Sequence, residues 1–243
     1  MMLKTVQGAS IKSVFEVLKD LLNDVNFVFD SSGLHMTTLD AAHVTFIQLK
    51  MAAENFEDYQ CAQRLTAGLN MSNTFKLLKI IGNNDTLCMS SDSRDTLKLR
   101  IENDQKKSKT MFDLKLLDIN EESFDMADLK FDVNTIVNSA ILQRTIRDMS
   151  NFASDVEIER SGRVLRLTCK GDFVDQCTEL ECADDFAGRI CFTYSLKYIN
   201  TFVKATNVSA NVTINQNESG AIMFKYSVAN LGELDFYLAP NTD

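Results

Sequence analysis

The stretch GASIKSVFEVLKDLLNDVNFVFDSSGLHMTTLD (8–40) contains the order of elements that decides the fold. Its first half carries apolar residues at helical spacing, namely Ile11, Val14, Phe15, Leu18, Leu21 and Leu22. Its second half, NFVFD followed by a Ser-Gly turn and LHMTTLD, is typical of a strand hairpin. The pattern therefore predicts a helix followed by two antiparallel strands.

The same order returns about 130 residues further along the chain. The segment NSAILQRTIRDMSNF (138–152) places Leu142, Ile146 and Met149 on one helical face. It is followed by DVEIE, a second Ser-Gly turn and RVLRLTCK, which again indicates two strands. Self-similarity of this kind predicts a duplicated fold.

Each half contains a second predicted helix, in SNTFKLLKIIGNND (72–85) and SLKYINTFVKAT (195–206). We expect the former to begin at a capping Ser72 or Asn73 and to end at Gly82. Alternating strands follow both helices, and no βαβ order indicates a parallel sheet. The fold class is therefore α+β, with helices lining one face of antiparallel sheets.

An acidic segment, LLDINEESFDMADLKFD (116–132), has neither helical nor strand periodicity and is interpreted as an exposed linker. We expect an N-terminal domain over 1–116, a connector over 117–131 and a C-terminal domain over 132–243. The apolar Phe124 and Met126 of the connector either pack on a neighbouring strand or line a groove for a partner.

The net charge of −9 argues against a simple nucleic-acid binder, because phosphate contacts need Lys and Arg. All four predicted helices nevertheless carry pairs of bases at helical spacing, away from their main apolar residues. The eight bases are Lys12, Lys19, Lys76, Lys79, Arg144, Arg147, Lys197 and Lys204. They form either ordinary solvated helix faces or a sequence-independent surface for DNA phosphates.

Motifs of catalysis and metal binding are absent from the sequence. The six cysteines form no C-x-x-C pair, and the two histidines lie far from them, so we expect reduced thiols in an intracellular protein and no metal or other cofactor. No nucleophile elbow, P-loop or dinucleotide fingerprint occurs either. We therefore expect a protein that is not an enzyme; a DNA-processing enzyme is the alternative from another class.

Several segments together resemble one family. DAAHVTFIQLK (40–50), LLDINEESFDM (116–126), RTIRDMS (144–150) and the terminal YLAP (237–240) are similar to the corresponding segments of proliferating cell nuclear antigen, the eukaryotic and archaeal DNA sliding clamp. The similarity also covers the first helix, the first hairpin and the last helix, so it extends over nearly the whole chain.

The resemblance implies a ring-forming homotrimer of two-domain subunits that encircles duplex DNA without reading its sequence. By position, the eight helix bases match the bases that face the central channel in that family. The family implies a processivity factor that tethers DNA polymerase, clamp loader, nuclease and ligase during DNA replication and repair. Alternatives are a subunit of a hetero-oligomeric clamp or a processivity factor that forms no ring. Localisation is expected to be nuclear or in a viral replication compartment.

The resemblance also implies two protein-binding surfaces. The partner-peptide site would comprise Leu39, His43, Val44, Phe46, Phe124, Met126, Tyr237, Leu238, Ala239 and Pro240. Subunits would join through edge strands over 109–116 and about 172–180, and the interface would comprise Thr110, Met111, Phe112, Leu114, Phe173, Val174 and Cys177. Pro240, the only proline, is expected to end the last strand.

Overall fold

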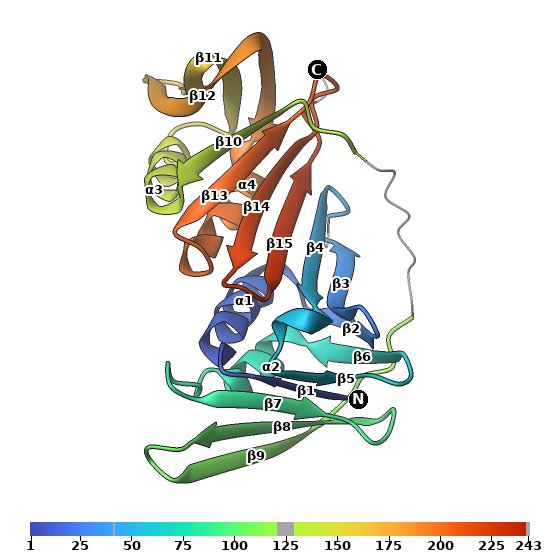
Figure 1. The fold of residues 1–243 in the computed structure, drawn as a ribbon. Coiled ribbons are helices and arrows are strands. Elements are labelled where there is room, and N and C mark those ends of the chain that lie inside the picture. Colours follow the sequence, from blue (N-terminus) through green and yellow to red (C-terminus); the bar gives the residue numbers. More distant parts are fainter. Residues whose placement is uncertain (41, 121–128, 242–243) are drawn as a thin grey trace. The chain divides into compact units, whose positions relative to one another are not determined.

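The structure is a computed structural model of the chain that describes residues 1–40, 42–120 and 129–241 (Figure 1). The chain forms two compact units. The N-terminal unit comprises residues 1–41, 47–124 and 227–234, and the C-terminal unit comprises residues 42–46, 125–226 and 235–243. Each unit contains one pair of packed α-helices.

The N-terminal unit has two layers of antiparallel strands around α1 (Gly8–Leu21) and α2 (Met71–Leu78). One sheet has the order β5-β1-β7-β8-β9, and the other group has the order β4-β3-β2-β6. The bounds are β1 (Met2–Thr5), β2 (Asp24–Asp30), β3 (Gly33–Leu39), β4 (Thr45–Ala52), β5 (Asp58–Gln60), β6 (Leu65–Asn70), β7 (Thr86–Ser90), β8 (Thr96–Asn103) and β9 (Ser108–Lys115), with a 3-10 turn η1 (Ala53–Asn55).

The apolar faces predicted for the helices are the buried faces. Ile11, Val14 and Leu18 of α1 are fully buried, and α1 packs against α2. The hairpin predicted over residues 26–40 is formed by β2 and β3, and β3 ends at Leu39. No helix in the described part of the chain is long and apolar enough to cross a membrane.

The N-terminal cap of α2 differs from the prediction. Asn70, the last residue of β6, has an extended backbone, and its side-chain oxygen accepts the N–H of Asn73 at 2.9 Å. Capping by Ser72 or Asn73 was therefore a wrong prediction, because Asn73 supplies the donor and not the acceptor. The end predicted at Gly82 was also wrong, since α2 ends at Leu78.

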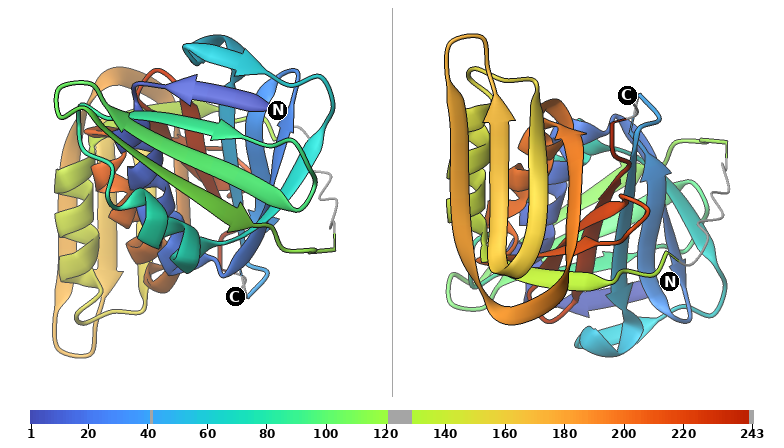
Figure 2. Two further views of the ribbon diagram at one scale, coloured as in Figure 1. Left: turned by 90° about the horizontal axis from the view of Figure 1, so that it is seen from below. Right: turned by 90° about the horizontal axis from the view of Figure 1, so that it is seen from above.

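The C-terminal unit repeats this plan with α3 (Ser139–Met149) and α4 (Leu196–Phe202), which continues as the 3-10 turn η2 (Val203–Asn207). One group of antiparallel strands has the order β10-β13-β14-β15, and a separate ladder pairs β11 with β12. The bounds are β10 (Val133–Asn138), β11 (Asp155–Lys170), β12 (Asp175–Ser195), β13 (Asn211–Gln216), β14 (Ile222–Val228) and β15 (Gly232–Leu238). α3 contacts β10 and β13, and α4 contacts β11 and β12 (Figure 2).

The long strand β11 folds back on itself at the predicted Ser-Gly turn. Arg166 lies 3.2 Å from Glu159, although seven extended residues would separate the two by roughly 23 Å. The register shifts on both sides of Gly162, which has a positive φ of 53°. Arg160 is fully buried beside this turn, where its guanidinium donates to the carbonyl oxygens of Gly162 and Asp184.

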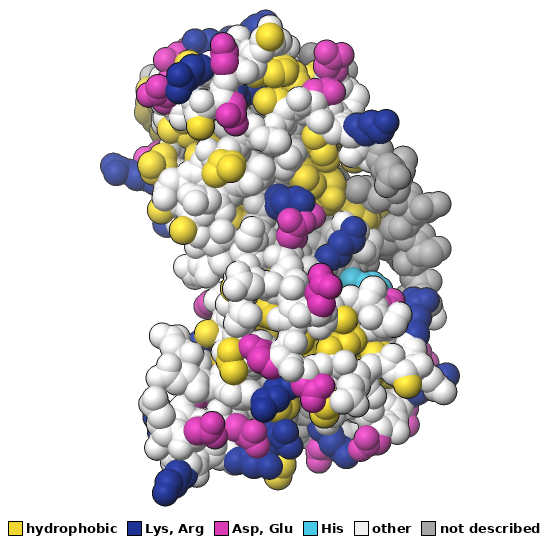
Figure 3. Space-filling view, viewed as in Figure 1, with side chains coloured by type: hydrophobic (Ala, Val, Ile, Leu, Met, Phe, Trp, Pro, Cys, Tyr) yellow, Lys and Arg dark blue, Asp and Glu magenta, His cyan; other side chains and the backbone are white. Residues whose placement is uncertain are grey.

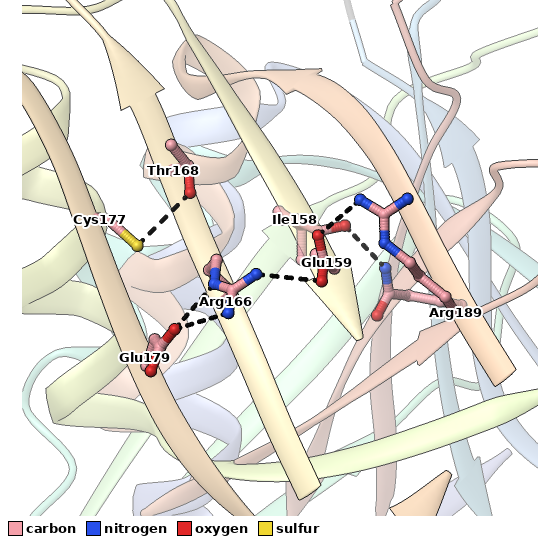
Figure 4. A network of polar contacts seen from close by, with 8 residues as sticks. Ile158, Glu159, Arg166, Thr168, Cys177, Glu179 and Arg189 are labelled. Carbon is pink, nitrogen blue, oxygen red and sulfur yellow. Dashed lines mark hydrogen bonds and ion pairs between the residues drawn. The ribbon is translucent and has the colours of Figure 1, made fainter. Parts of the chain in front are cut away.

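A network of charged side chains fastens β11 to β12 (Figure 4). Glu159 accepts from Arg189 at 2.9 Å and from Arg166 at 3.2 Å, and Arg166 also reaches Glu179 at 2.7 Å. Arg189 and then Arg166 hold the pKa of Glu159 below its ordinary value, against the opposing effect of its burial. The charged form of this carboxylate is therefore the form that stabilises the fold.

We expect Glu159→Gln to lower the free energy of unfolding at pH 7 by about 1–3 kcal/mol, since it removes charge-assisted hydrogen bonds. Because the folded pKa is depressed, this stabilisation is present above the unfolded glutamate pKa and disappears as the pH falls through the folded value. Denaturant unfolding from pH 7 into the acid range measures it. Glu157→Gln, an exposed neighbour, should change the free energy by less than about 0.5 kcal/mol. Equal losses for both variants would contradict the assignment.

Candidate nucleic-acid and partner-binding surfaces

The bases of the N-terminal unit lie on the paired helices α1 and α2, but Lys12 differs from the others. Its Nζ donates to the carbonyl oxygen of Ile81 at 2.5 Å, and its side chain is half-buried. This carbonyl lies just beyond the end of α2, where backbone carbonyls lack helical partners. Lys12 therefore connects the two helices.

The other three bases of this unit leave their charge near the surface. Lys19 pairs with Asp20 at 2.8 Å, and its Nζ lies 5.1 Å from the centre of the Phe75 ring. Lys76 is exposed, and its Nζ donates to the side chain of Asn73 at 3.1 Å, while Lys79 is exposed at the end of α2.

The C-terminal unit presents its four predicted bases on α3, α4 and η2, and all four are exposed. The side chain of Arg144 is 87% exposed and lies 3.9 Å from Asp148, a separation that gives a weak ion pair. The Nζ of Lys197 lies 5.4 Å from the centre of the Tyr198 ring. Arg147 and Lys204 complete the set.

The helices are basic although the chain is acidic. α1 to α4, with the C-cap of α2 and η2, carry eight bases and only three acids, which are Glu16, Asp20 and Asp148. The chain as a whole has 25 bases and 34 acids. Over the face drawn in Figure 3, side chains of both signs are interspersed and form no patch of a single sign. The excess of positive charge is thus a property of the helices.

The C-terminal unit also contains an aromatic cluster from the predicted partner site. The rings of Phe46 and Tyr237 meet edge to face with centres 5.4 Å apart, and the ring of Phe131 lies 6.4 Å from Tyr237. Phe131 was not among the predicted site residues. It follows Leu129 and Lys130 at the end of the linker, and no pattern in the sequence indicated its contact with Tyr237.

Two further predicted partner-site residues, His43 and Val44, also belong to the C-terminal unit and directly precede β4, of which only Thr45 and Phe46 are in this unit. His43 has a positive φ of 57° and is exposed, and Val44 is 43% exposed. A positive φ is uncommon for a residue with a side chain, and it places both residues in a bend before the strand. Leu39 is half-buried at the end of β3 and belongs to the N-terminal unit. Phe124 and Met126 lie outside the described residues.

Pro240 follows the last strand closely, and the next residue, Asn241, is hydrogen-bonded within the C-terminal unit. β15 ends at Leu238, which is buried, and exposed Ala239 precedes Pro240, as predicted from the proline. A Cβ at Gly220 would lie 2.7 Å from Pro240 Cγ, so the glycine permits this close approach. Asn241 then donates its N–H to the Thr193 carbonyl oxygen at 2.8 Å.

The two ends of the predicted connector are anchored, each in its own unit. The N–H of Leu117 donates to the carbonyl oxygen of Gly68 at 2.8 Å. A Cβ added at Gly68 would lie 2.2 Å from the Leu117 carbonyl oxygen. The carbonyl of Ile119 accepts from Asn26 at 3.1 Å. At the other end, the carbonyl of Lys130 accepts from Asn217 at 3.0 Å. Both ends of the predicted connector are therefore hydrogen-bonded to their units, which an exposed linker does not require.

Both predicted interface strands have an open edge among the described residues. β9 is the last strand of its sheet, and β12 pairs only with β11. Met111 of β9 is 69% exposed, with Thr110 exposed and Phe112 and Leu114 half-buried. The second strand begins at Asp175 and not near residue 172, because the Gly171 N–H donates to the Val174 oxygen and closes a turn. Phe173 is therefore in the turn, 83% exposed and packed on Phe152.

One group of potential metal ligands occurs in the described part of the chain. Ligand atoms of Glu157, Glu159 and Cys191 lie within 4.8 Å of one another. Both carboxylate oxygens of Glu159 already accept from Arg166 and Arg189, and these guanidinium groups compete with any cation. The thiol of Cys191 has a raised pKa because it is partly buried, which opposes the thiolate form that binds metals.

Comparisons with known proteins identify one family over the whole described length. The family description "Proliferating cell nuclear antigen, N-terminal domain" matches residues 1–124, and "Proliferating cell nuclear antigen, C-terminal domain" matches residues 125–241. The chain is also 34% identical to the "Probable DNA polymerase sliding clamp 1" of Paramecium bursaria Chlorella virus 1 over 252 residues, covering 98% of this chain and 95% of that protein.

The position of Lys12 gives a test that separates structural bases from exposed ones. We expect Lys12→Met to lower the free energy of unfolding by about 1–2 kcal/mol, because the Ile81 carbonyl loses a charged donor. Lys79→Met on the exposed end of α2 should change it by less than about 0.5 kcal/mol. Thermal and denaturant unfolding of both variants measure the difference, and equal stability would show that the Lys12 contact is unimportant.

Proposed function

The chain belongs to the proliferating cell nuclear antigen family of DNA sliding clamps and polymerase processivity factors, and we propose that its helix bases hold duplex DNA. The observation that carries this proposal is the gathering of eight bases on helices of an otherwise acidic chain. Bases on helix faces can contact the phosphates of DNA of any sequence. Topological linkage would make high affinity unnecessary and permit sliding.

The ring would be a homotrimer joined through the open edges of β9 and β12. Pairing of these edges would satisfy their free backbone groups and remove an aggregation hazard. Sedimentation tests it directly. A stable species at three times the 27.3 kDa chain mass supports the homotrimer. A monomer at micromolar concentration excludes it and favours the processivity factor without a ring, whereas trimerisation only with a different chain favours the hetero-oligomeric clamp.

Partner proteins would dock on the C-terminal unit through short peptides with aromatic anchors. The half-buried rings of Phe131 and Tyr237 would provide an aromatic wall, with Phe46 buried against Tyr237. Val44 and Ala239, each two residues from a ring of this cluster in the sequence, are exposed apolar residues. Clamp loader, nuclease and ligase are proposed as partners beside DNA polymerase. The proposal includes no catalytic activity and places the protein where DNA is replicated, in a nucleus or a viral replication compartment.

The DNA proposal predicts the effect of reversing three exposed bases, Lys76, Arg144 and Lys204. The triple change to Glu should lower clamp-dependent processive synthesis by roughly five- to ten-fold, since repulsion of phosphates replaces attraction. Sedimentation should be unchanged. Reversal of exposed Lys50, Lys107 and Lys130, which are outside the helices, is the matched control. Equal effects of both sets would reject the helix surface as the DNA site.

The docking proposal predicts the effect of a charge placed beside the aromatic cluster. Val44→Asp should weaken binding of a peptide with two aromatic anchors by about ten-fold, because an apolar contact becomes a buried carboxylate. Fluorescence anisotropy of the labelled peptide measures the affinity. Val6→Asp changes an exposed valine of the N-terminal unit, 55% exposed against 43% for Val44, and should bind the peptide normally. Unchanged binding to both variants would move the docking site elsewhere.

A further inference from the structure

The open edges of β9 and β12 carry complementary patterns of charge on their exposed faces. Side chains alternate along each strand, and of the intervening residues Phe112, Leu114 and Leu180 are half-buried, while Thr110 is exposed. The exposed faces consist, in chain order, of Lys109, Met111, Asp113 and Lys115 on β9, and of Asp175, Cys177, Glu179 and Glu181 on β12. In the lower region of Figure 3, where Figure 1 places β7 to β9, side chains of both signs are interspersed.

The three acids of β12 differ in how far their charge is already balanced. Glu179 is held by Arg166 at 2.7 Å (Figure 4). The side chain of Glu181 is 85% exposed and only 4.0 Å from its nearest cation, Arg163. Asp175 is exposed at the first position of the strand. The acids at the two ends of this segment are therefore the more available ones.

We propose that β9 of one copy pairs antiparallel with residues 175–182 of β12 in a second copy in one register, which places Lys109 opposite Glu181 and Lys115 opposite Asp175. In this register Met111 faces Glu179 and Asp113 faces Cys177. The two acids without a close partner thus meet the two lysines, of which Lys109 also pairs with Glu102 of its own chain at 3.3 Å. The balanced acid, Glu179, meets a neutral side chain. The inference rests on the proposed self-association and adds to it the alignment of the strands.

Neighbouring registers are the relevant competitors, because a slip of two residues keeps every side chain on its face. A slip in one direction places Asp113 opposite Asp175, and a slip in the other places Asp113 opposite Glu179. Like charges directly opposite destabilise a strand pair. Of the three registers, only the proposed one places no two acids directly opposite each other. Repulsion of the Asp113 carboxylate therefore disfavours both slipped registers.

The half-buried side chains on the opposite face of the strands favour a different register from the one that the charges favour. In the proposed alignment Phe112 and Leu180 are diagonal neighbours, a separation that an aromatic side chain spans. In the register that pairs Asp113 with Glu179, Phe112 would stand directly opposite Leu180. Apolar contact alone would therefore favour that slipped register, and charge favours the proposed one.

The native Cys177 reports the register without any change to β12. A disulfide forms only between residues whose Cβ atoms are about 3.5–4.5 Å apart, which excludes diagonal pairs. Asp113→Cys should form an intersubunit disulfide with Cys177 of a second copy under mild oxidation, measured on a non-reducing gel. Met111→Cys and Lys115→Cys are the controls for the two slips and should cross-link at least five-fold less. Cross-linking mainly through position 111 or 115 would overturn the proposed register.

A charge exchange tests the same alignment independently. Lys109→Glu should weaken self-association by about five-fold, since one exposed pair becomes repulsive, and addition of Glu181→Lys should restore it. Lys130→Glu reverses the same charge outside both strands and should have no effect. Failure of Glu181→Lys to restore assembly, or a trimeric wild type in which none of the three cysteine variants cross-links, overturns the register and leaves the ring intact. A monomeric wild type overturns the self-association itself.

Discussion

Burial of one face of each helix is the constraint on which both units depend. Ile11 and Leu18 of α1 and Leu142 and Ile146 of α3 have no exposed surface. Once these residues are fixed against the strands, the helical period leaves only the opposite face for polar side chains. The position of the bases is therefore a consequence of core packing, and their sign is the only free choice. Bases outnumber acids on these helices by eight to three, so an acidic chain carries an excess of positive charge on them.

This arrangement suits a protein that must slide. Attraction to phosphates depends on the number of cations and falls with salt, so under the proposed function a few exposed bases on each unit would give weak, sequence-independent contact. Lys12 shows that a base on such a face can have another role, because its charge is directed to a backbone carbonyl. The bases of α3 and α4 make few strong pairs, and Arg144 is only 3.9 Å from Asp148. The surface is thus unequal, with more available charge on some helices than on others.

The sequence predicts those features that depend on periodicity or on backbone chemistry. The helices, the first hairpin and the strand end before Pro240 were all predicted, because their signals are local. The helix cap at Asn70 was missed because either of two neighbouring residues also satisfied the capping rule. The start of β12 was misplaced because Gly171 closes a turn, in which its N–H donates to the Val174 oxygen and its Cα lies close to the backbone oxygen of Phe152, a residue distant in sequence. The contact of Phe131 with Tyr237 joins distant segments, and no local pattern encodes it.

The open edges of β9 and β12 could pair with unrelated strands, and charged side chains affect this association in two ways. An unpaired edge invites association with any strand, and charged side chains oppose this because most partners leave them unmatched. The same charges become favourable when the partner strand carries their complement. Asp113 matters most in this respect, since its carboxylate adds nothing to the attraction between the two edges but opposes each slipped register. Asp113 would therefore determine the register by destabilising the slipped alignments. Lys109 and Lys115 would supply the attraction in the proposed alignment.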